Sequence, residues 1–244
     1  MKENLNMSQQ RIIESEHNDF YKKIVAIRDG KMKKEGLILI EGEDLIDEAK
    51  KVGALQYALT YDPKFIVNDV PTTLVKQGLY RNLASYQSLP KVIGVAKFTL
   101  SKEPGDKVVY LDGVQDPGNV GTLIRTALAF HYSSVILSKD CASIFNAKTI
   151  QSTKGALFKI PVGVMDLEEL KNKGYNIYLT TLDGEDEATF GKLKEPFALV
   201  LGNEGRGIRT EHLSLGQKLR INMSGIDSLN VAIAGGIFLY RFSR

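Results

Sequence analysis

The stretch that decides the fold lies near the C-terminal end and runs Phe197-Ala-Leu-Val-Leu-Gly-Asn-Glu-Gly-Arg-Gly-Ile208. Its first five residues are apolar or small, which predicts a buried strand over 197–201 that ends in a turn at three glycines. Such a turn exposes backbone N–H and C=O groups, which can bind the polar edges of an adenine or a ribose. Glu204 lies inside the turn. It could take part in ligand binding, or it could do no more than cap the next helix. A lone glycine cluster is a weak motif, so its interpretation depends on the rest of the chain.

A second stretch of the same character lies upstream, from Leu111 to Phe130. Asp116-Pro-Gly predicts a turn after a strand, and Asn119 is a suitable N-cap for a helix over 119–130. Helical spacing leaves Gly121 and Arg125 one turn apart and outside the buried stripe. A guanidinium above a glycine has room for a phosphate, which it can bind through two parallel hydrogen bonds. The plainer alternative is a solvated helix arginine.

A third stretch, Ile221 to Tyr240, completes the set. It predicts a helix from 229, with Ser228 as its cap. The helix is crowded with small residues, which allow close packing against a second helix and favour a dimer contact: Ala232, Ala234, Gly235 and Gly236. Packing does not explain the polar pair Ser228 and Asn230, which we interpret as functional.

The composition limits the classes of protein to which this chain can belong. The chain has 244 residues, 43% of them hydrophobic, which is enough for one large domain or two modest ones. Cys141 is the single cysteine, so no intramolecular disulfide can form, and no stretch resembles a signal peptide. No apolar run approaches the roughly 20 residues that cross a bilayer. We therefore expect a cytoplasmic protein without a membrane partner. The net charge of +3 supports a polyanionic partner only weakly.

The order of predicted elements indicates an α/β protein with two domains. Residues 1–100 predict a small α/β domain, and the polar stretch 101–107 predicts a linker. From residue 108 strands alternate with helices, which predicts a mostly parallel sheet with helices on both faces. The expected elements are helices at 8–30, 44–52, 119–130, 146–153 and 166–173, a helical turn at 210–215 and a helix from 229, with strands at 37–41, 57–61, 73–76, 92–98, 108–111, 134–137, 158–164, 175–181, 197–201 and 219–221. All three glycine-containing stretches follow strands, at the sheet edge where ligands bind in such folds.

The three stretches together resemble a known family. Asn119-Val-Gly121 with Arg125, Leu201-Gly-Asn-Glu-Gly205, and Met223-Ser-Gly225 followed by Ser228-Leu-Asn-Val231 are similar, in order and spacing, to the motifs of the SpoU (TrmH-type) branch of the SPOUT RNA methyltransferases. The resemblance covers residues 108–242. Residues 1–100 are similar to the substrate-binding domain of that family, whose fold is like ribosomal protein L30e.

The resemblance implies a specific fold and activity. Residues 108–244 would form the SPOUT methyltransferase domain, with a deep trefoil knot, a homodimer built on the knot, and transfer of a methyl group from S-adenosylmethionine to an RNA ribose 2'-hydroxyl, in rRNA rather than tRNA. The implied cofactor-binding residues are Thr181, Leu182, Gly202, Ile221, Met223 and Leu229. The implied catalytic residues are Asn119, Arg125, Glu204, Ser228 and Asn230. The chain departs from the family pattern at His131, Gln151, Lys154 and Asn222, outside the catalytic set.

The basicity of the guanidinium group limits the role that Arg125 can have. A guanidinium with a pKa above about 12 is a poor base, so we expect Arg125 to hold a phosphate and polarise the 2'-hydroxyl, with Glu204 and Asn119 orienting it. The alternatives are a tRNA 2'-O-methyltransferase, a base methyltransferase, and a catalytically idle RNA-binding or assembly protein. A nicotinamide-dependent dehydrogenase is disfavoured because no Gly-x-Gly-x-x-Gly follows the first strand of either half. No zinc pattern is present, so we expect no metal.

Overall fold

The computed structural model describes residues 12–85 and 88–243, and it divides into two compact units, Met1–Thr99 and Leu100–Arg244. The polar stretch 101–107, expected to be a linker, is attached to the second unit. The Ser101 amide donates a hydrogen bond of 2.7 Å to the carbonyl of Val162, and Ser101 pairs with Gly163 as an isolated bridge. Strand β5 then begins at Lys107.

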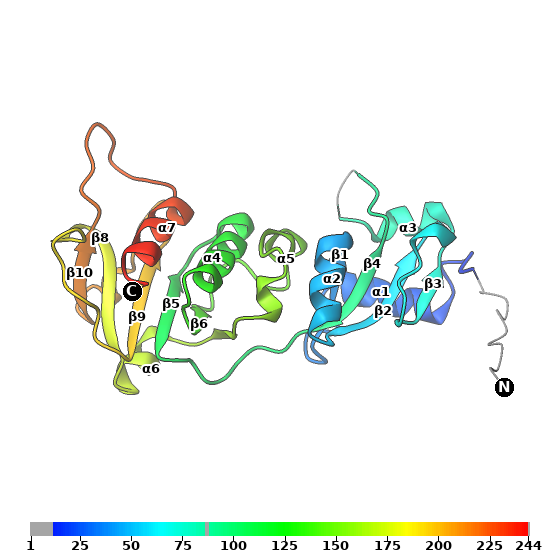
Figure 1. Ribbon diagram of the computed structural model, residues 1–244, viewed down its shortest axis with the longest axis horizontal. Coiled ribbons are helices and arrows are strands. Elements are labelled where there is room, and N and C mark those ends of the chain that lie inside the picture. The colour runs from blue at the N-terminus through cyan, green and yellow to red at the C-terminus, as the bar shows by residue number, and fades with distance from the viewer. Residues whose placement is uncertain (1–11, 86–87, 244) are drawn as a thin grey trace. The chain divides into compact units, whose positions relative to one another are not determined.

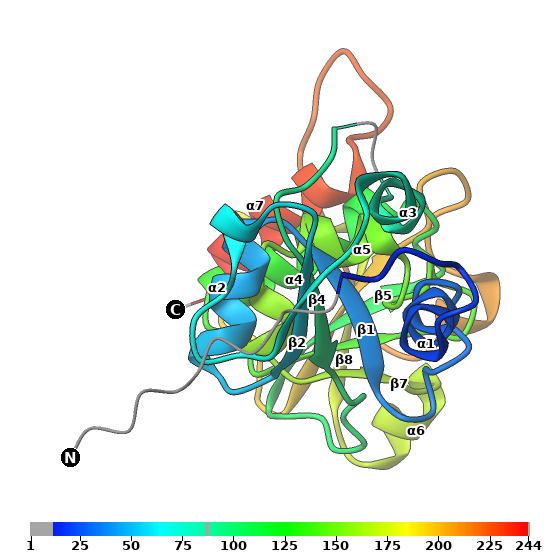
Figure 2. The same cartoon turned by 90° about the vertical axis from the view of Figure 1, so that its right-hand side faces the viewer.

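The first unit is a four-stranded sheet with the order β1-β4-β2-β3. Its strands are β1 (Leu37–Glu41), β2 (Leu55–Thr60), β3 (Thr72–Leu74) and β4 (Ile93–Lys97), and its helices are α1 (Asp19–Arg28), α2 (Glu43–Lys51) and α3 (Gln77–Leu83). Alternate residues of β4 point to opposite faces: Ile93 and Val95 share a core with residues of α1 and α3, whereas Gly94 lies against Ile46 of α2. Helices therefore cover both faces of this sheet (Figure 2).

Helix α1 is shorter than the helix expected over 8–30. It begins at Asp19, because the Asn18 side chain accepts a hydrogen bond of 3.1 Å from the Tyr21 amide and caps the first turn. Upstream, Ile13 pairs with Val75 as a bridge, and its amide donates to the Leu74 carbonyl, so this part of the chain extends β-type pairing. Residues 8–11 lie outside the described residues.

The second unit contains a six-stranded, all-parallel sheet with the order β10-β8-β9-β5-β6-β7 (Figure 1). Its strands are β5 (Lys107–Asp112), β6 (Ser134–Leu137), β7 (Val162–Val164), β8 (Asn176–Asp186), β9 (Phe197–Gly202) and β10 (Gln217–Arg220), and its helices are α4 (Pro117–Ala129), α5 (Ala147–Ser152), α6 (Leu167–Asn172) and α7 (Val231–Arg241). The prediction of an α/β fold with a parallel sheet is confirmed. The trefoil knot stays a prediction.

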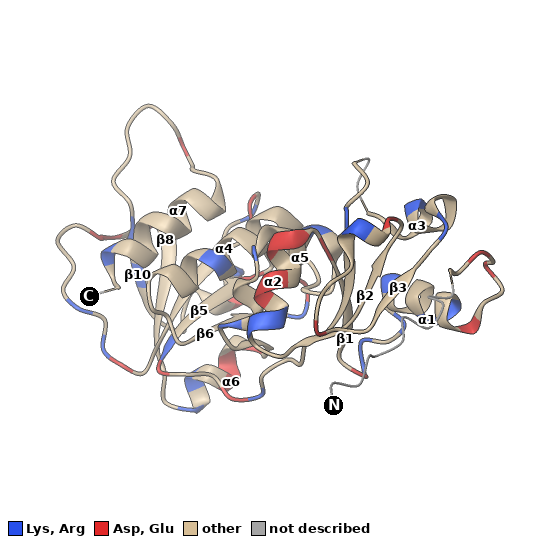
Figure 3. Ribbon diagram, turned by 45° about the vertical axis from the view of Figure 1, so that its right-hand side comes forward, with Lys and Arg blue, Asp and Glu red and all other residues tan. Residues whose placement is uncertain are grey.

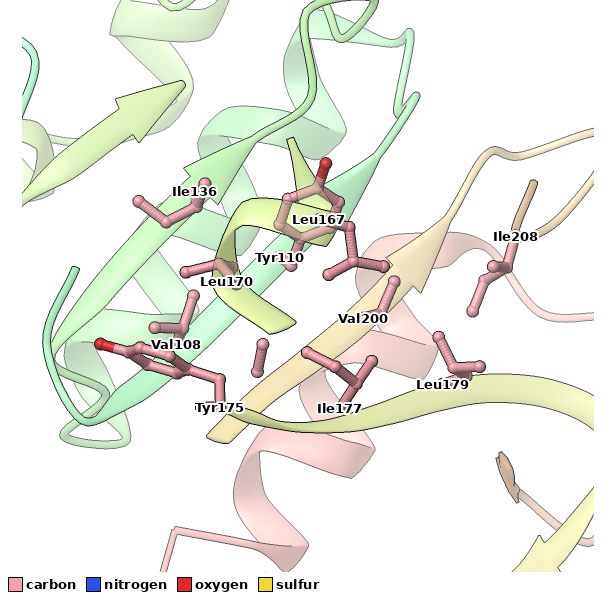
Figure 4. Packing of buried hydrophobic residues seen from close by; sticks show 11 residues of the cluster. Val108, Tyr110, Ile136, Leu167, Leu170, Tyr175, Ile177, Leu179, Val200 and Ile208 are labelled. Carbon is pink, nitrogen blue, oxygen red and sulfur yellow. The ribbon is translucent and has the colours of Figure 1, made fainter. Parts of the chain in front are cut away.

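Each face of this sheet has its own layer of helices. On one face, Leu167 and Leu170 of α6 pack on Tyr110 and Val200, from β5 and β9 (Figure 4). On the other face lie α4 and α7, which contact each other closely at Gly235. A Cβ at Gly235 would lie 2.4 Å from Cδ2 of Leu123 in α4. At least this small residue of α7 is therefore used for packing within the chain.

The strand expected over 158–164 is wrong in its first part. Residues Ala156–Phe158 form a 3₁₀ turn, and only Val162–Val164 pair as a strand. Gly155 adopts a left-handed conformation at φ 84°, which starts the turn. Ala156 and Leu157 are buried, and the turn packs against α4, so this apolar run is a turn beneath a helix.

Within the part of the chain that the structure describes, no helix combines the length and the apolar character needed to cross a membrane.

Candidate cofactor and catalytic site

A cavity of about 440 Å³ opens between the second half of β8 and the loop that follows the carboxyl end of β9. The segment that joins β10 to α7 contributes part of its wall and extends away from the sheet (Figure 1). Its lining contains all six residues that the resemblance assigns to the cofactor: Thr181, Leu182, Gly202, Ile221, Met223 and Leu229. They come from three separate segments, which the parallel sheet brings to one edge.

The glycine loop that follows β9 forms one wall of the cavity. Asn203 and Gly207 exchange two backbone hydrogen bonds of 2.9 and 3.0 Å, so the loop closes on itself. The Asn203 side chain also accepts hydrogen bonds from the amides of Gly205 and Arg206. A Cβ at Gly202 would lie 2.4 Å from the backbone carbon of Gly207, so only glycine fits there.

Glu204 uses its carboxylate to join this loop to the start of α4. It accepts hydrogen bonds from the amides of Gln115 and Asp116, at 3.1 and 3.0 Å, and from Nδ2 of Asn119, at 3.0 Å. Burial opposes the charged form of Glu204, but these hydrogen bonds outweigh it and lower the pKa of the carboxyl. Glu204 therefore binds a helix that precedes it by some 85 residues in sequence rather than capping the next one.

A chain of hydrogen bonds continues from Glu204 to the start of α7. Oδ1 of Asn119 accepts a hydrogen bond of 3.2 Å from Nδ2 of Asn230. Oδ1 of Asn230 in turn accepts hydrogen bonds from the amides of Ala232 and Ile233. The predicted catalytic residues Glu204 and Asn230 are thus joined by hydrogen bonds through the third, Asn119.

The two helix caps differ from the sequence-based expectation. Asp116 caps α4 by accepting a hydrogen bond of 2.9 Å from the Asn119 amide, so Asn119 lies inside the first turn and its side chain is free to bind Glu204. Asn230 caps α7 in place of Ser228. Ser228 lies on the wall of the cavity and is exposed.

Arg125 does not lie on the cavity wall. It is exposed on α4, and it has no hydrogen bond or ion pair to any of the described residues. The expected open space at Gly121 is also wrong. A Cβ there would lie 2.5 Å from both Cβ of Ser152 and the carbonyl oxygen of Thr149, so α5 already fills that position. This single chain therefore brings four of the five predicted catalytic residues to the cavity and its edge.

The cavity wall also carries an ion pair that the sequence pattern did not indicate. Nζ of Lys218 lies 2.9 Å from Oδ2 of Asp183, and both residues line the cavity. The hydrogen bond from Lys218 lowers the pKa of the Asp183 carboxyl. Asp183 was missed because β8 continues to Asp186, beyond the strand end expected at 181, and β10 pairs with this extension after a register shift at Lys218.

The cavity lining fits S-adenosylmethionine in its chemistry. Leu182, Ile221, Met223 and Leu229 offer apolar surface for an adenine ring, and the glycine loop offers backbone groups for its polar edge. Carboxylates at Asp183 and Glu204 suit a ligand that carries positive charge on its sulfonium and amino groups. No three His, Cys, Asp or Glu side chains within the described ranges are grouped so that they could hold a metal ion.

Comparison with known proteins identifies the family of this chain. The sequence profile described as the SpoU rRNA Methylase family matches residues 106–240. The chain is 34% identical, over 224 residues, to the 23S rRNA (guanosine(2553)-2'-O)-methyltransferase RlmP of Bacillus subtilis. The aligned region covers 85% of this chain and 88% of RlmP. The chain is also 37% identical, over 148 residues, to the 23S rRNA (guanosine-2'-O-)-methyltransferase RlmB of Xanthomonas campestris; that match spans 56% of this chain and 58% of the relative.

Solved structures agree with the sequence comparison. An rRNA methyltransferase from Sinorhizobium meliloti superposes with a TM-score of 0.82 at 27% identity, over 96% of this chain and 97% of that one. Its AdoMet-bound form gives a TM-score of 0.80, over 95% and 96% of the two chains. The predictions of an RNA ribose 2'-O-methyltransferase and of S-adenosylmethionine as its cofactor are confirmed. Residues of all three sequence motifs meet at the edge of one cavity. The profile spans more than half of the residues, so the chain belongs to the SpoU rRNA Methylase family.

Proposed function

We propose that this protein methylates the ribose 2'-hydroxyl of a guanosine in 23S rRNA, with S-adenosylmethionine in the cavity described above. The observation that carries the proposal is the chain Glu204–Asn119–Asn230 at the edge of that cavity. The substrate follows the printed names of the relatives RlmP and RlmB. S-adenosylmethionine supplies an electrophilic methyl group, so the protein has to align the ribose oxygen with it and assist loss of the hydroxyl proton.

The side chains of the site divide these tasks. The ionised Glu204 holds the Asn119 amide in one orientation, and Asn230 fixes its carbonyl from the other side. Ser228 on the cavity wall provides a hydroxyl near the ribose. Arg125 binds the phosphate beside the target nucleotide and polarises the 2'-hydroxyl, since a guanidinium binds phosphate with two parallel hydrogen bonds.

We further propose that the enzyme is a homodimer in which Arg125 serves the partner's cavity. Three large apolar residues of α7 recur at helical spacing and are exposed, Ile233 by 59%, Ile237 by 37% and Tyr240 by 57%. Figure 3 shows α7 without charge over nearly all of its length. A second copy with the same stripe would cover this surface. Helix α4, which carries Arg125, packs beside α7 and would lie next to the partner.

Mixing two inactive variants tests the placement of Arg125. R125A retains an intact cavity, and G202A retains an intact arginine. If each site combines the cavity of one subunit with the arginine of the other, random mixing after mild unfolding restores about a quarter of wild-type activity, because half of the dimers are mixed and each has one complete site. Each variant alone serves as the control. No recovery in dimers that native mass spectrometry shows to be mixed would contradict the arrangement.

Methyl transfer itself is tested with purified protein, labelled S-adenosylmethionine, and either 23S rRNA or tRNA. We expect label in 23S rRNA, located on a ribose by its resistance to alkaline cleavage at one guanosine. Label in tRNA only, or on a base, would refute the substrate assignment. A protein that binds RNA but not S-adenosylmethionine would be the idle assembly protein considered above.

The remaining features follow from the resemblance alone and complete the proposal. The first unit would be an L30e-like RNA-binding domain, the second would contain the trefoil knot, and the protein would act in the cytoplasm. RNA binding by the first unit should weaken steeply with salt, because phosphate contacts release counterions. A flat salt response would argue against an electrostatic RNA surface.

A further inference from the structure

An ionic cluster that is only partly buried adjoins the glycine loop. At its centre is Asp112, the last residue of β5, whose side chain is 0% exposed. Its Oδ2 accepts a hydrogen bond of 3.0 Å from the Arg209 amide and lies 2.9 Å from Nδ1 of His212. Its Oδ1 lies 3.3 Å from Nε of Arg209. The segment that follows the glycine loop is therefore bound to the end of the central strand β5.

Asp140 extends the cluster to the loop itself. Its Oδ1 contacts a terminal nitrogen of Arg209, and its Oδ2 lies 3.3 Å from a terminal nitrogen of Arg206. The hydroxyl of Ser138 donates a hydrogen bond of 2.6 Å to Oδ1 of Asp140 and holds this carboxylate in place. Arg206 belongs to the glycine loop and lines the cavity, whereas Arg209, Asp112 and Asp140 do not line it.

The loop is thus fixed at both ends to the C-terminal end of β5 and the residue that follows it. At its start, Nδ2 of Asn203 donates a hydrogen bond of 2.7 Å to the carbonyl of Gly113. At its end, Arg209 binds Asp112, the neighbour of Gly113. Between these two points lie Glu204 and the backbone that forms the cavity wall.

We infer that Arg209, with Asp112 and Asp140, positions the glycine loop for cofactor binding and methyl transfer. This inference rests on the proposed function. Three facts support it: the ion pairs converge on the residue that ends the loop, they reach both the end of β5 and the turn after β6, and one carboxylate is fully buried. A buried ion pair adds little stability compared with apolar side chains of the same size, so its presence here is better explained by the conformation that it imposes.

Arg209 is a positioning residue in this view, because it acts through the loop and not on the substrate. A lysine at 209 could bind one carboxylate but cannot reach two at once as a guanidinium does. R209K should therefore retain part of the function that R209Q loses. A residue needed only for folding would change the melting temperature in both variants and leave the affinity of the folded protein unchanged.

The test measures the dissociation constant of S-adenosylmethionine by calorimetry, at a temperature where circular dichroism shows every variant to be folded. We expect R209Q to weaken binding about tenfold, the equivalent of one lost hydrogen bond to a charged group, and R209K to weaken it less. D140N, which leaves the Asp112 contacts intact, provides a second variant if R209Q does not fold, and should also weaken binding. The matched control is K139Q, because Lys139 is adjacent to Asp140 but pairs with Asp166, the residue before α6, away from the loop.

The outcomes distinguish failure of the inference about Arg209 from failure of the proposed function. Binding by R209Q and D140N that equals wild type, with only the melting temperature lowered, overturns the inference and leaves the proposed function intact. Absence of binding by the wild-type protein overturns the proposed function, and the inference falls with it. Equal weakening in K139Q also overturns the inference, since it would show a general charge effect.

Discussion

Replacing Asn119 with aspartate places a second carboxylate against Glu204. In the structure, Nδ2 of Asn119 donates a hydrogen bond of 3.0 Å to Oε1 of Glu204, whose carboxyl has a lowered pKa and is ionised at neutral pH. In N119D the donor becomes an oxygen that carries negative charge. Asn230 can still donate to the other oxygen of residue 119. Only the contact with Glu204 therefore changes, from a hydrogen bond to a repulsion between two charges.

The separation of the two groups sets the size of the effect. Two like charges 3.0 Å apart repel by about 1.4 kcal/mol in bulk water and by about 5.5 kcal/mol at the effective dielectric constant of a protein surface. Glu204 is exposed, so the lower value is the better guide. A penalty of about 1.4 kcal/mol corresponds to a tenfold loss in an equilibrium constant. We therefore expect the loop to move and the affinity for S-adenosylmethionine to fall at least tenfold near pH 8.

The effect should depend on pH in a known direction. Like charges raise the pKa of one member of the pair, so the repulsion is fully present above that raised pKa and disappears as the pH falls through it. The affinity of N119D, measured by calorimetry from pH about 8 down to about 5, should therefore rise from below that of N119A toward that of the wild-type protein, because a protonated carboxyl again donates a hydrogen bond across the pair. N119A is the control, because it removes both side-chain contacts of residue 119 without adding a charge. N18D controls for net charge, since aspartate caps α1 as well as asparagine does.

Two results would refute this reasoning. Wild-type affinity in N119D at pH 8 would show that Asn119 and Glu204 are not coupled during cofactor binding. A loss that is the same at both ends of the pH range would show that the charge pair is not its cause.

Three further predictions concern packing and pH. G235A should lower the free energy of unfolding by about 1–3 kcal/mol in a urea titration, because its Cβ would overlap Leu123, whereas G236A should be neutral or stabilising since nothing lies within 4 Å; equal effects would contradict the packing. Y132F should be neutral or stabilising in the same titration, because the buried hydroxyl of Tyr132 has no hydrogen-bond partner among the described residues; a clear loss of stability would contradict this. The lowered pKa of Glu204 stabilises the fold above the ordinary glutamate pKa, and this contribution should vanish as the pH falls through the lowered value. E204Q should therefore lack this part of the acid dependence of the melting temperature. A profile of melting temperature against pH that equals that of the wild-type protein would contradict this prediction.

The sequence was sufficient for the elements with a strong local signal. The apolar runs before each glycine-containing stretch predicted β5 and β9 to within a residue or two, because a buried parallel strand shows as a short continuous apolar run. The helix expected over 8–30 failed where Asn18 starts α1, and the strand expected over 158–164 failed where Gly155 starts a turn. In both regions an apolar run alone did not distinguish a helix, a strand and a buried turn.

The helix caps show a different limit. Asp116 and Asn119 can both cap α4, and Ser228 and Asn230 can both cap α7. The caps expected from the sequence, Asn119 and Ser228, are wrong in both pairs. The choice depends on contacts with distant segments: Asn119 lies in the first turn because its side chain binds Glu204 and Asn230, both from other parts of the chain.

The sequence by itself determined the two α/β units, the parallel sheet of the second one, and the three stretches that carry the family resemblance, since each of these is written in local patterns of apolar residues and glycines. Only the tertiary structure decided that Gly121 packs on α5, that Arg125 stays off the cavity of its own chain, and that Asp112, Asp140 and Arg209 meet beside the glycine loop. The physical reason is the same in each case. Contacts between residues far apart in the chain depend on where the sheet places its strand ends, and no local pattern encodes that position.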